Sequence, residues 1–171
     1  MDGSQTSSGS VLLVEALTPE LLSDLMQRVG YRVQAQPGDN GAIRLHSATG
    51  GVSFQVVFSN PVSGQMERFL DARFVAAIRI EGDLAPTIIN GWNASMRFAR
   101  LYTTEGFLVL DMDVSAISGI SEGHVMAAVQ VWDRLLQGLI AYLRDVLAPR
   151  QSTASRDNDL AQTGEKHLAT A

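Results

Sequence analysis

The chain has 171 residues, of which 46% are hydrophobic, so it is long enough to fold as one domain with a buried core. It contains no cysteine, which excludes disulfides, thiolate nucleophiles and cysteine-bound metals. The net charge is −5 and the 13 Lys and Arg residues are scattered, so we expect no nucleic-acid partner.

Both ends of the chain are polar. Residues 1–10 lack the basic start and the apolar run of a secretory signal, and the run from Val11 to Leu17 is too short to span a membrane. We therefore expect a cytoplasmic protein with no membrane partner. Residues 1–10 and 149–171 show no hydrophobic periodicity and are predicted to be disordered, which leaves one domain over residues 11–148.

The first half of this domain predicts one helix followed by several strands. Residues 11–14 fit either a short strand or a hydrophobic lead-in to the helix. Thr18 and Pro19 are typical of a helix start, and Gly30 is typical of its end. Alternating apolar and polar residues then predict strands at 31–36, 43–46, 52–59 and 70–79. Such strands form antiparallel hairpins with one polar face, here carrying Arg32, Gln34, Arg44, Gln55, Arg73 and Arg79.

The second half predicts a helix, a hairpin and a long final helix. Asp83 is expected to cap a helix that starts near Pro86 and places Trp92 in its apolar stripe. A hairpin over residues 98–113 turns at Glu105 and Gly106. The last helix runs from Ser121 to about Leu147, and its predicted inward side comprises Val125, Val129, Trp132, Leu136, Leu139, Ile140, Leu143 and Leu147. The pattern predicts an α+β fold with three helices on one face of an antiparallel sheet.

Candidate structural or interaction residues gather in the second half. They are Asn90, Trp92, Asn93, Arg97, Arg100, Asp111, Asp113 and Trp132. The tryptophans fit core positions, and the asparagines fit backbone capping near a helix end, with a partner-binding role as the alternative. Arg97 and Arg100 are predicted to pair with Asp111 and Asp113 across the hairpin. Because residues two apart on a strand point the same way, the two aspartates also fit a metal or acid–base pair.

Recognisable catalytic motifs are absent from the sequence. His46, His124 and His167 do not have the spacing of a zinc site, and no serine lies in a nucleophile elbow. The glycine pairs do not form a phosphate-binding loop. We therefore expect no enzymatic activity, no metal and no cofactor.

Several segments of the chain resemble the YbjN family, also called the putative bacterial sensory transduction regulator family. The segments are Asn90–Asn93, Arg97–Tyr102, Leu110–Asp113, and Ile120–Glu122 ahead of the helix with Trp132. The opening patterns Leu17–Glu20 and Gly30–Val33 fit as well, so the resemblance extends over residues 12–147. It implies a fold like that of type III secretion chaperones, frequent dimerisation and no established enzymatic activity.

Two non-enzymatic functional hypotheses follow from these observations, and a third, set against them, is a hydrolytic enzyme that uses Asp111 and Asp113. The first is a non-enzymatic, homodimeric, chaperone-like adaptor or regulator in bacterial sensory or stress signalling. It would hold an unidentified protein or peptide on the polar sheet face. The alternative is a small-ligand sensor, with a pocket between the last helix and the sheet lined by Trp92, Phe98 and Trp132.

Overall fold

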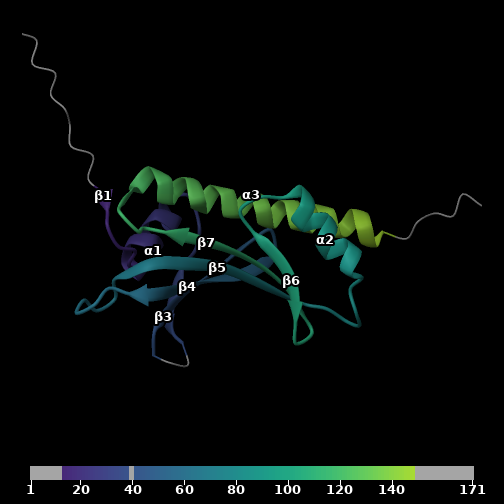
Figure 1. Cartoon of the computed structure of the whole chain (residues 1–171), viewed down its shortest axis with the longest axis horizontal. Coiled ribbons are helices and arrows are strands. Elements are labelled where there is room, and N and C mark those ends of the chain that lie inside the picture. The colour runs from purple at the N-terminus through teal and green to yellow at the C-terminus, as the bar shows by residue number, and fades with distance from the viewer. Residues whose placement is uncertain (1–12, 39–40, 149–171) are drawn as a thin grey trace, which may run out of the picture.

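The computed structural model describes residues 13–38 and 41–148 (Figure 1). The predictions of disorder for residues 1–10 and 149–171 lie outside the described residues. The elements in chain order are β1 (Leu13–Val14), α1 (Pro19–Arg28), β2 (Gln34–Pro37), β3 (Ile43–Thr49), β4 (Val52–Pro61), β5 (Phe69–Arg79), α2 (Pro86–Ser95), β6 (Arg100–Thr104), β7 (Phe107–Ser115), β8 (Ile120–Ser121) and α3 (Glu122–Leu147).

Six of the strands form one antiparallel sheet in the order β2-β3-β4-β5-β7-β6. β7 lies between β5 and β6, so the last hairpin joins the sheet through its second strand. In this register Arg73 of β5 lies opposite Asp113 of β7, and Arg100 of β6 lies opposite Asp111. β1 pairs with β8 in a separate two-stranded sheet, which identifies residues 13–14 as a short strand.

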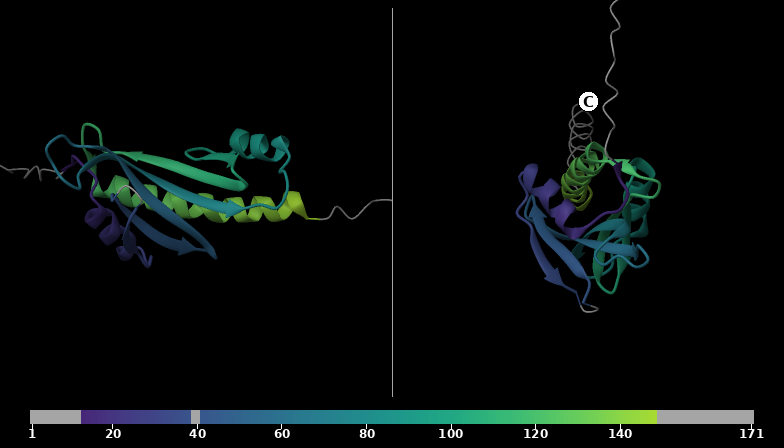
Figure 2. Two further views of the ribbon diagram at one scale, coloured as in Figure 1. Left: turned by 90° about the horizontal axis from the view of Figure 1, so that it is seen from below. Right: turned by 90° about the vertical axis from the view of Figure 1, so that its left-hand side faces the viewer.

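The helices lie on one side of the six-stranded sheet, and the opposite face carries no helix (Figures 1 and 2). The sheet curves around α3, as the right-hand view of Figure 2 shows. α1 packs against α3 and β3, whereas α2 packs against β6 and α3. The fold is therefore α+β, with three helices on an antiparallel sheet, as the sequence predicts.

Aromatic side chains fill the core between α3 and the sheet. Trp132 of α3 is fully buried, and its ring centroid lies 5.6 Å from that of Phe54 and 5.7 Å from that of Phe74. Trp92 of α2 is also fully buried, 5.6 Å from the ring of Tyr142. Burial of such large apolar surfaces is the main term that holds the helices on the sheet.

Two of the three predicted helix starts are confirmed by their caps. The Thr18 hydroxyl accepts a hydrogen bond from the backbone N–H of Leu21 at 3.0 Å, and the Ser121 hydroxyl accepts one from His124 at 3.1 Å. The predicted cap of α2 is wrong, because Ala85 occupies that position and no side chain caps the helix. Asp83 lies two residues before the capping position, too early for its side chain to reach the free N–H groups of the first turn. Pro86, the first residue of the helix, has no backbone N–H that a cap could satisfy.

Several predicted strand boundaries and one predicted core position also differ from the structure. The strand expected at 31–36 is β2 (Gln34–Pro37), an edge strand, where proline is tolerated because one side of the strand needs no ladder hydrogen bonds. The hairpin strand expected from Phe98 begins at Arg100. Leu147, expected to face inward, is 57% exposed, because the last turn of α3 extends past the sheet (Figure 2).

Candidate functional site

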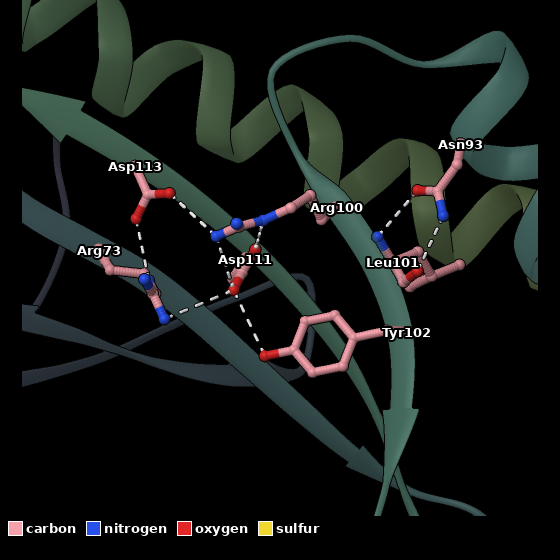
Figure 3. Close-up of polar contacts among 7 residues, drawn as sticks. All are labelled: Arg73, Asn93, Arg100, Leu101, Tyr102, Asp111 and Asp113. Carbon is pink, nitrogen blue, oxygen red and sulfur yellow. Dashed lines mark hydrogen bonds and ion pairs between the residues drawn. The ribbon is translucent and has the colours of Figure 1, made fainter.

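A cluster of charged side chains lies on the sheet face that no helix covers. Arg100 of β6 donates from Nε to Asp111 Oδ1 at 2.8 Å and from Nη2 to Asp111 Oδ2 at 3.2 Å. The same Nη2 donates to Asp113 Oδ2 at 2.9 Å (Figure 3). Arg100 therefore clamps both aspartates of β7, which share one face because they are two residues apart on a strand.

Two further side chains complete this cluster. Arg73 of β5 donates from Nε to Asp113 Oδ1 at 2.9 Å, and its Nη1 lies 3.9 Å from Asp111 Oδ2. The Tyr102 hydroxyl donates to Asp111 Oδ2 at 3.3 Å. We call Arg73, Arg100, Tyr102, Asp111 and Asp113 the charged cluster; its two positive and two negative charges balance (Figure 3).

Burial and charge explain the electrostatics of the charged cluster. Asp111 is only 2% exposed although its side chain points away from the helices, because the two arginines and Tyr102 cover it. The hydrogen bond to Asp113 raises the pKa of Arg73, and the hydrogen bond to Asp111 raises the pKa of Arg100. Burial, followed by the charge of Asp111, raises the pKa of Tyr102. Each aspartate thus has fixed positive partners, as expected for an ion-pair network.

The geometry favours this ion-pair role over a metal or acid–base role for Asp111 and Asp113. All four carboxylate oxygens are within reach of a guanidinium, so a metal ion would have to displace arginines. Within residues 13–38 and 41–148, no group of three or more His, Asp or Glu is placed to hold a metal ion.

The predicted pairing of Arg97 with the aspartates is wrong, since Arg73 supplies the second guanidinium. Arg97 lies in the segment between α2 and β6, beside α3. Strand alternation places Arg73 on the polar face, but only the pairing of β5 with β7 brings it opposite Asp113. The sequence gives no local signal for that pairing, because α2 and β6 separate the two strands along the chain.

Asn93 joins α2 to the edge of the sheet. Its Oδ1 accepts a hydrogen bond from the Leu101 N–H, and its Nδ2 donates to the Leu101 carbonyl, both at 2.9 Å (Figure 3). The sequence predicted that Asn93 satisfies backbone groups near a helix end. In the structure it satisfies the backbone groups of edge strand β6 instead. A side chain that occupies both backbone groups of an edge residue protects the edge from pairing with another strand. Asn90, one turn earlier on α2, is exposed.

The predicted pocket is only partly found, because Trp92 and Phe98 line a groove between α2 and α3 that does not include Trp132. Trp132 packs between Phe54 and Phe74 in the core, and Phe98 is 74% exposed. Neither indole N–H has a hydrogen-bond acceptor among the described residues, although both atoms are buried. The two tryptophans are therefore core residues, as their helix stripes predict.

A different crevice of about 450 Å³ lies between α3, the end of α1 and the β3–β4 hairpin. Its polar residues form a network in which Asp133 Oδ1 accepts hydrogen bonds from the Tyr31 hydroxyl and the Thr49 hydroxyl, each at 2.8 Å. Arg134 also lines the crevice but forms no ion pair with a described residue. Burial, then the hydrogen bond to Asp133, raises the pKa of Tyr31 above its usual value.

Tyr31→Phe tests the electrostatics of this crevice. The unfolded chain releases the Tyr31 proton near pH 10, whereas the folded protein holds it to a higher pH. The contribution of Tyr31 to the free energy of unfolding is therefore complete below pH ~10. It is lost as the pH rises further, by at most about 1.4 kcal/mol per pH unit. In urea unfolding at successive pH values, the variant should lose less stability than the wild type above pH ~10. Parallel curves for the two proteins would contradict this assignment.

One solved structure has the same fold as this chain. A crystal structure of YbjN, described as a putative transcription regulator from E. coli, superimposes with a TM-score of 0.59 at 12% sequence identity. The match covers 80% of this chain and 97% of that one, and at this identity it shows the fold alone. The comparison with curated proteins gives no match.

The described part of the chain contains no helix that is long and apolar enough to cross a membrane. The kinship to type III secretion chaperones stays a prediction. Residues 18–145 match the family model of YbjN, "Putative bacterial sensory transduction regulator". This match spans most of the 171 residues, and the chain therefore belongs to the YbjN family.

Proposed function

We propose that this protein is a non-enzymatic regulator in bacterial sensory or stress signalling that binds another protein through its uncovered sheet face. The family description, a regulator of sensory transduction, supports the regulatory part. The chaperone-like adaptor role and a cytoplasmic location are part of the same proposal. Fractionation of cells should recover the protein with the cytoplasmic contents, and recovery elsewhere would contradict that part.

The observation that carries the proposal is the composition of this face. Val57 of β4, Val75 of β5 and Val109 of β7 lie on this face, next to the charged cluster, and together form an apolar strip across the middle strands. Val57 and Val75 are partly exposed, whereas Val109 is 5% exposed. Protein interfaces combine an apolar centre with arginine and tyrosine in this way. Asp111 and Asp113 already hold the guanidinium groups of Arg73 and Arg100 in place. Binding of a partner to these arginines would therefore cost little conformational entropy.

Site-specific crosslinking in cells tests this surface. A photo-crosslinking amino acid in place of Val75 should give a discrete adduct with one protein, which mass spectrometry can identify. The same amino acid in place of Ala127, exposed on the outer side of α3, is the matched control and should not give that adduct. Val75→Asp should abolish co-purification of the crosslinked protein. No adduct at position 75, or equal adducts at both positions, would contradict the proposal.

We also propose that the protein is a homodimer, on the strength of the family resemblance. Light scattering during size exclusion should then give twice the 18.4 kDa chain mass. A pair of variants, Val75→Asp on the sheet face and Ala127→Asp on α3, distinguishes the two candidate interfaces. The variant that becomes monomeric identifies the interface, whereas a wild-type protein that is strictly monomeric contradicts the proposal.

The crevice beside Asp133 supports a second candidate function, a small-ligand sensor. It lies between the last helix and the sheet, as that hypothesis requires, and it holds a carboxylate with no ion pair among the described residues. A compound that binds only the folded state raises the melting temperature by mass action.

Thermal shift measurements against a metabolite library test this second function. A specific ligand should raise the melting temperature of the wild type and of Asp145→Asn, whose carboxylate is exposed on the same helix away from the crevice. Asp133→Asn should lose the shift while keeping its hydrogen bonds from Tyr31 and Thr49. No shift from any compound, or an equal shift in Asp133→Asn, would contradict a sensor at this crevice.

A further inference from the structure

A groove of about 270 Å³ separates α2 from α3 on the helical side of the molecule. Its walls are mostly apolar and come from three parts of the chain. They are formed by Trp92 of α2, by Val131, Leu135 and Gly138 of α3, and by the segment Met96–Phe98 that leads to β6. Gly138 lies against the Trp92 ring, whose outermost carbon would be in ordinary van der Waals contact, 3.7 Å away, with a Cβ at that position. The groove has space for a large apolar side chain of another molecule.

Phe98 is the unusual residue of this groove. Its side chain is 74% exposed, and its backbone has a φ of +72°, in the left-handed region that disfavours residues with a Cβ. Neighbouring Met96 is also exposed. Large apolar side chains gathered on a surface mark sites of interaction, and a strained backbone that presents one of them strengthens the inference.

The charged residues around the groove indicate the chemical class of its ligand. Arg97 and Arg134 both line it, and neither forms an ion pair with an acidic residue within the described ranges. This differs from the charged cluster, where Arg73 and Arg100 are neutralised by aspartates. On a chain of net charge −5, two unpaired guanidinium groups beside an apolar groove favour a ligand that is both apolar and acidic.

We infer that the α2–α3 groove binds a short peptide segment of a partner protein, in which a large apolar side chain is flanked by Asp or Glu. The apolar side chain lies in the groove against Phe98 and Met96, while the carboxylates pair with Arg97 and Arg134. This inference rests on the proposed protein-binding function but uses a different surface. The crosslinking at Val75 does not involve the groove, so failure of one experiment is distinguishable from failure of the other.

Selection from a library of random short peptides displayed on phage tests the inference with the full-length protein. Enriched peptides should carry an aromatic or large aliphatic residue beside acidic residues. For a synthetic enriched peptide, Phe98→Asn should weaken binding about thirty-fold, the effect of losing a hot-spot residue. Arg97→Gln combined with Arg134→Gln should weaken binding and reduce its dependence on salt concentration.

Matched variants separate binding from folding. Asparagine tolerates the left-handed conformation, so Phe98→Asn should melt no lower than the wild type, and Phe98→Gly serves as a second variant with the same property. Ile117→Asn removes an exposed apolar side chain elsewhere, and Arg144→Gln removes an exposed arginine of α3; neither should change peptide binding. The inference is overturned if no peptide is enriched, if the enriched peptides lack acidic residues, or if Phe98→Asn binds them as tightly as the wild type.

Discussion

A chain in which Trp132 is replaced with alanine should lose about 4 kcal/mol of its free energy of unfolding. Trp132 is fully buried and contacts the rings of Phe54 and Phe74, so the truncation leaves a cavity between α3 and the sheet. Urea unfolding followed by circular dichroism measures the change. An unchanged dependence on urea concentration would show that the folded and unfolded states keep their compactness.

Trp132→Phe provides the informative comparison. Because the indole N–H has no acceptor among the described residues, this substitution removes volume but no hydrogen bond. It should cost only about 1–2 kcal/mol, much less than the alanine variant. A phenylalanine variant as unstable as the alanine variant would mean that the indole N–H has a partner of its own.

Arg100→Ala should lower the free energy of unfolding by about 2 kcal/mol. The substitution removes both guanidinium hydrogen bonds of Asp111, which is 2% exposed, and leaves it with Tyr102 at 3.3 Å and Arg73 at 3.9 Å. A nearly buried carboxylate without a close positive partner is unfavourable, although the half-exposed position of Arg100 keeps the cost below that of a fully buried pair.

Arg97→Ala is the matched control for this prediction. This substitution also removes one exposed arginine, three residues from Arg100. Arg97, however, forms no ion pair with a member of the charged cluster. Its free energy of unfolding should stay within about 0.5 kcal/mol of the wild type. If Asp111→Asn is added to each variant, the cost of losing Arg100 should shrink while that of losing Arg97 stays the same. Equal costs for the two alanine variants would refute the role given to Arg100.

The two surfaces described here differ in the charge that they present to a partner. On the sheet face, arginines and aspartates neutralise one another beside a strip of valines. In the α2–α3 groove, Arg97 and Arg134 have no acidic partner in the described part of the chain. Binding at the groove should therefore depend more strongly on salt concentration than binding at the sheet face. This difference allows the two contacts to be recognised in one purified complex.

Local sequence patterns predicted most of the secondary structure, because they depend on interactions within a few residues. Thr18 and Ser121 cap helices since their hydroxyls reach backbone N–H groups three residues ahead. The turn at Glu105 and Gly106 has positive φ at both residues, as such hairpins require. Where two local signals compete, the prediction failed. Asp83 is a good capping residue, but the helix starts at Pro86, too far from Asp83 for its side chain to cap it.

The candidate site was only half visible in the sequence. Arg100, Asp111 and Asp113 belong to one hairpin, and their alternation predicts a shared face, which the structure confirms. Arg73 could not be assigned to them, because β5 pairs with β7 only after the chain has crossed through α2 and β6. The groove at Phe98 was anticipated in part, since Trp92 and Phe98 were predicted to line a pocket beside the last helix, but its place between α2 and α3 depends on how the two helices pack.

By itself the sequence determined the helices, the hairpins, the burial of Trp92 and Trp132, and the family of this protein. Periodicity and capping are properties of neighbouring residues, so these features need no knowledge of the fold. Tertiary structure alone decided which arginine faces Asp113, that Asn93 binds the edge of β6, and that Phe98 stands in solvent beside Trp92. The physical reason is that these contacts join residues whose distance in space is set by strand order and helix packing, which no local pattern records.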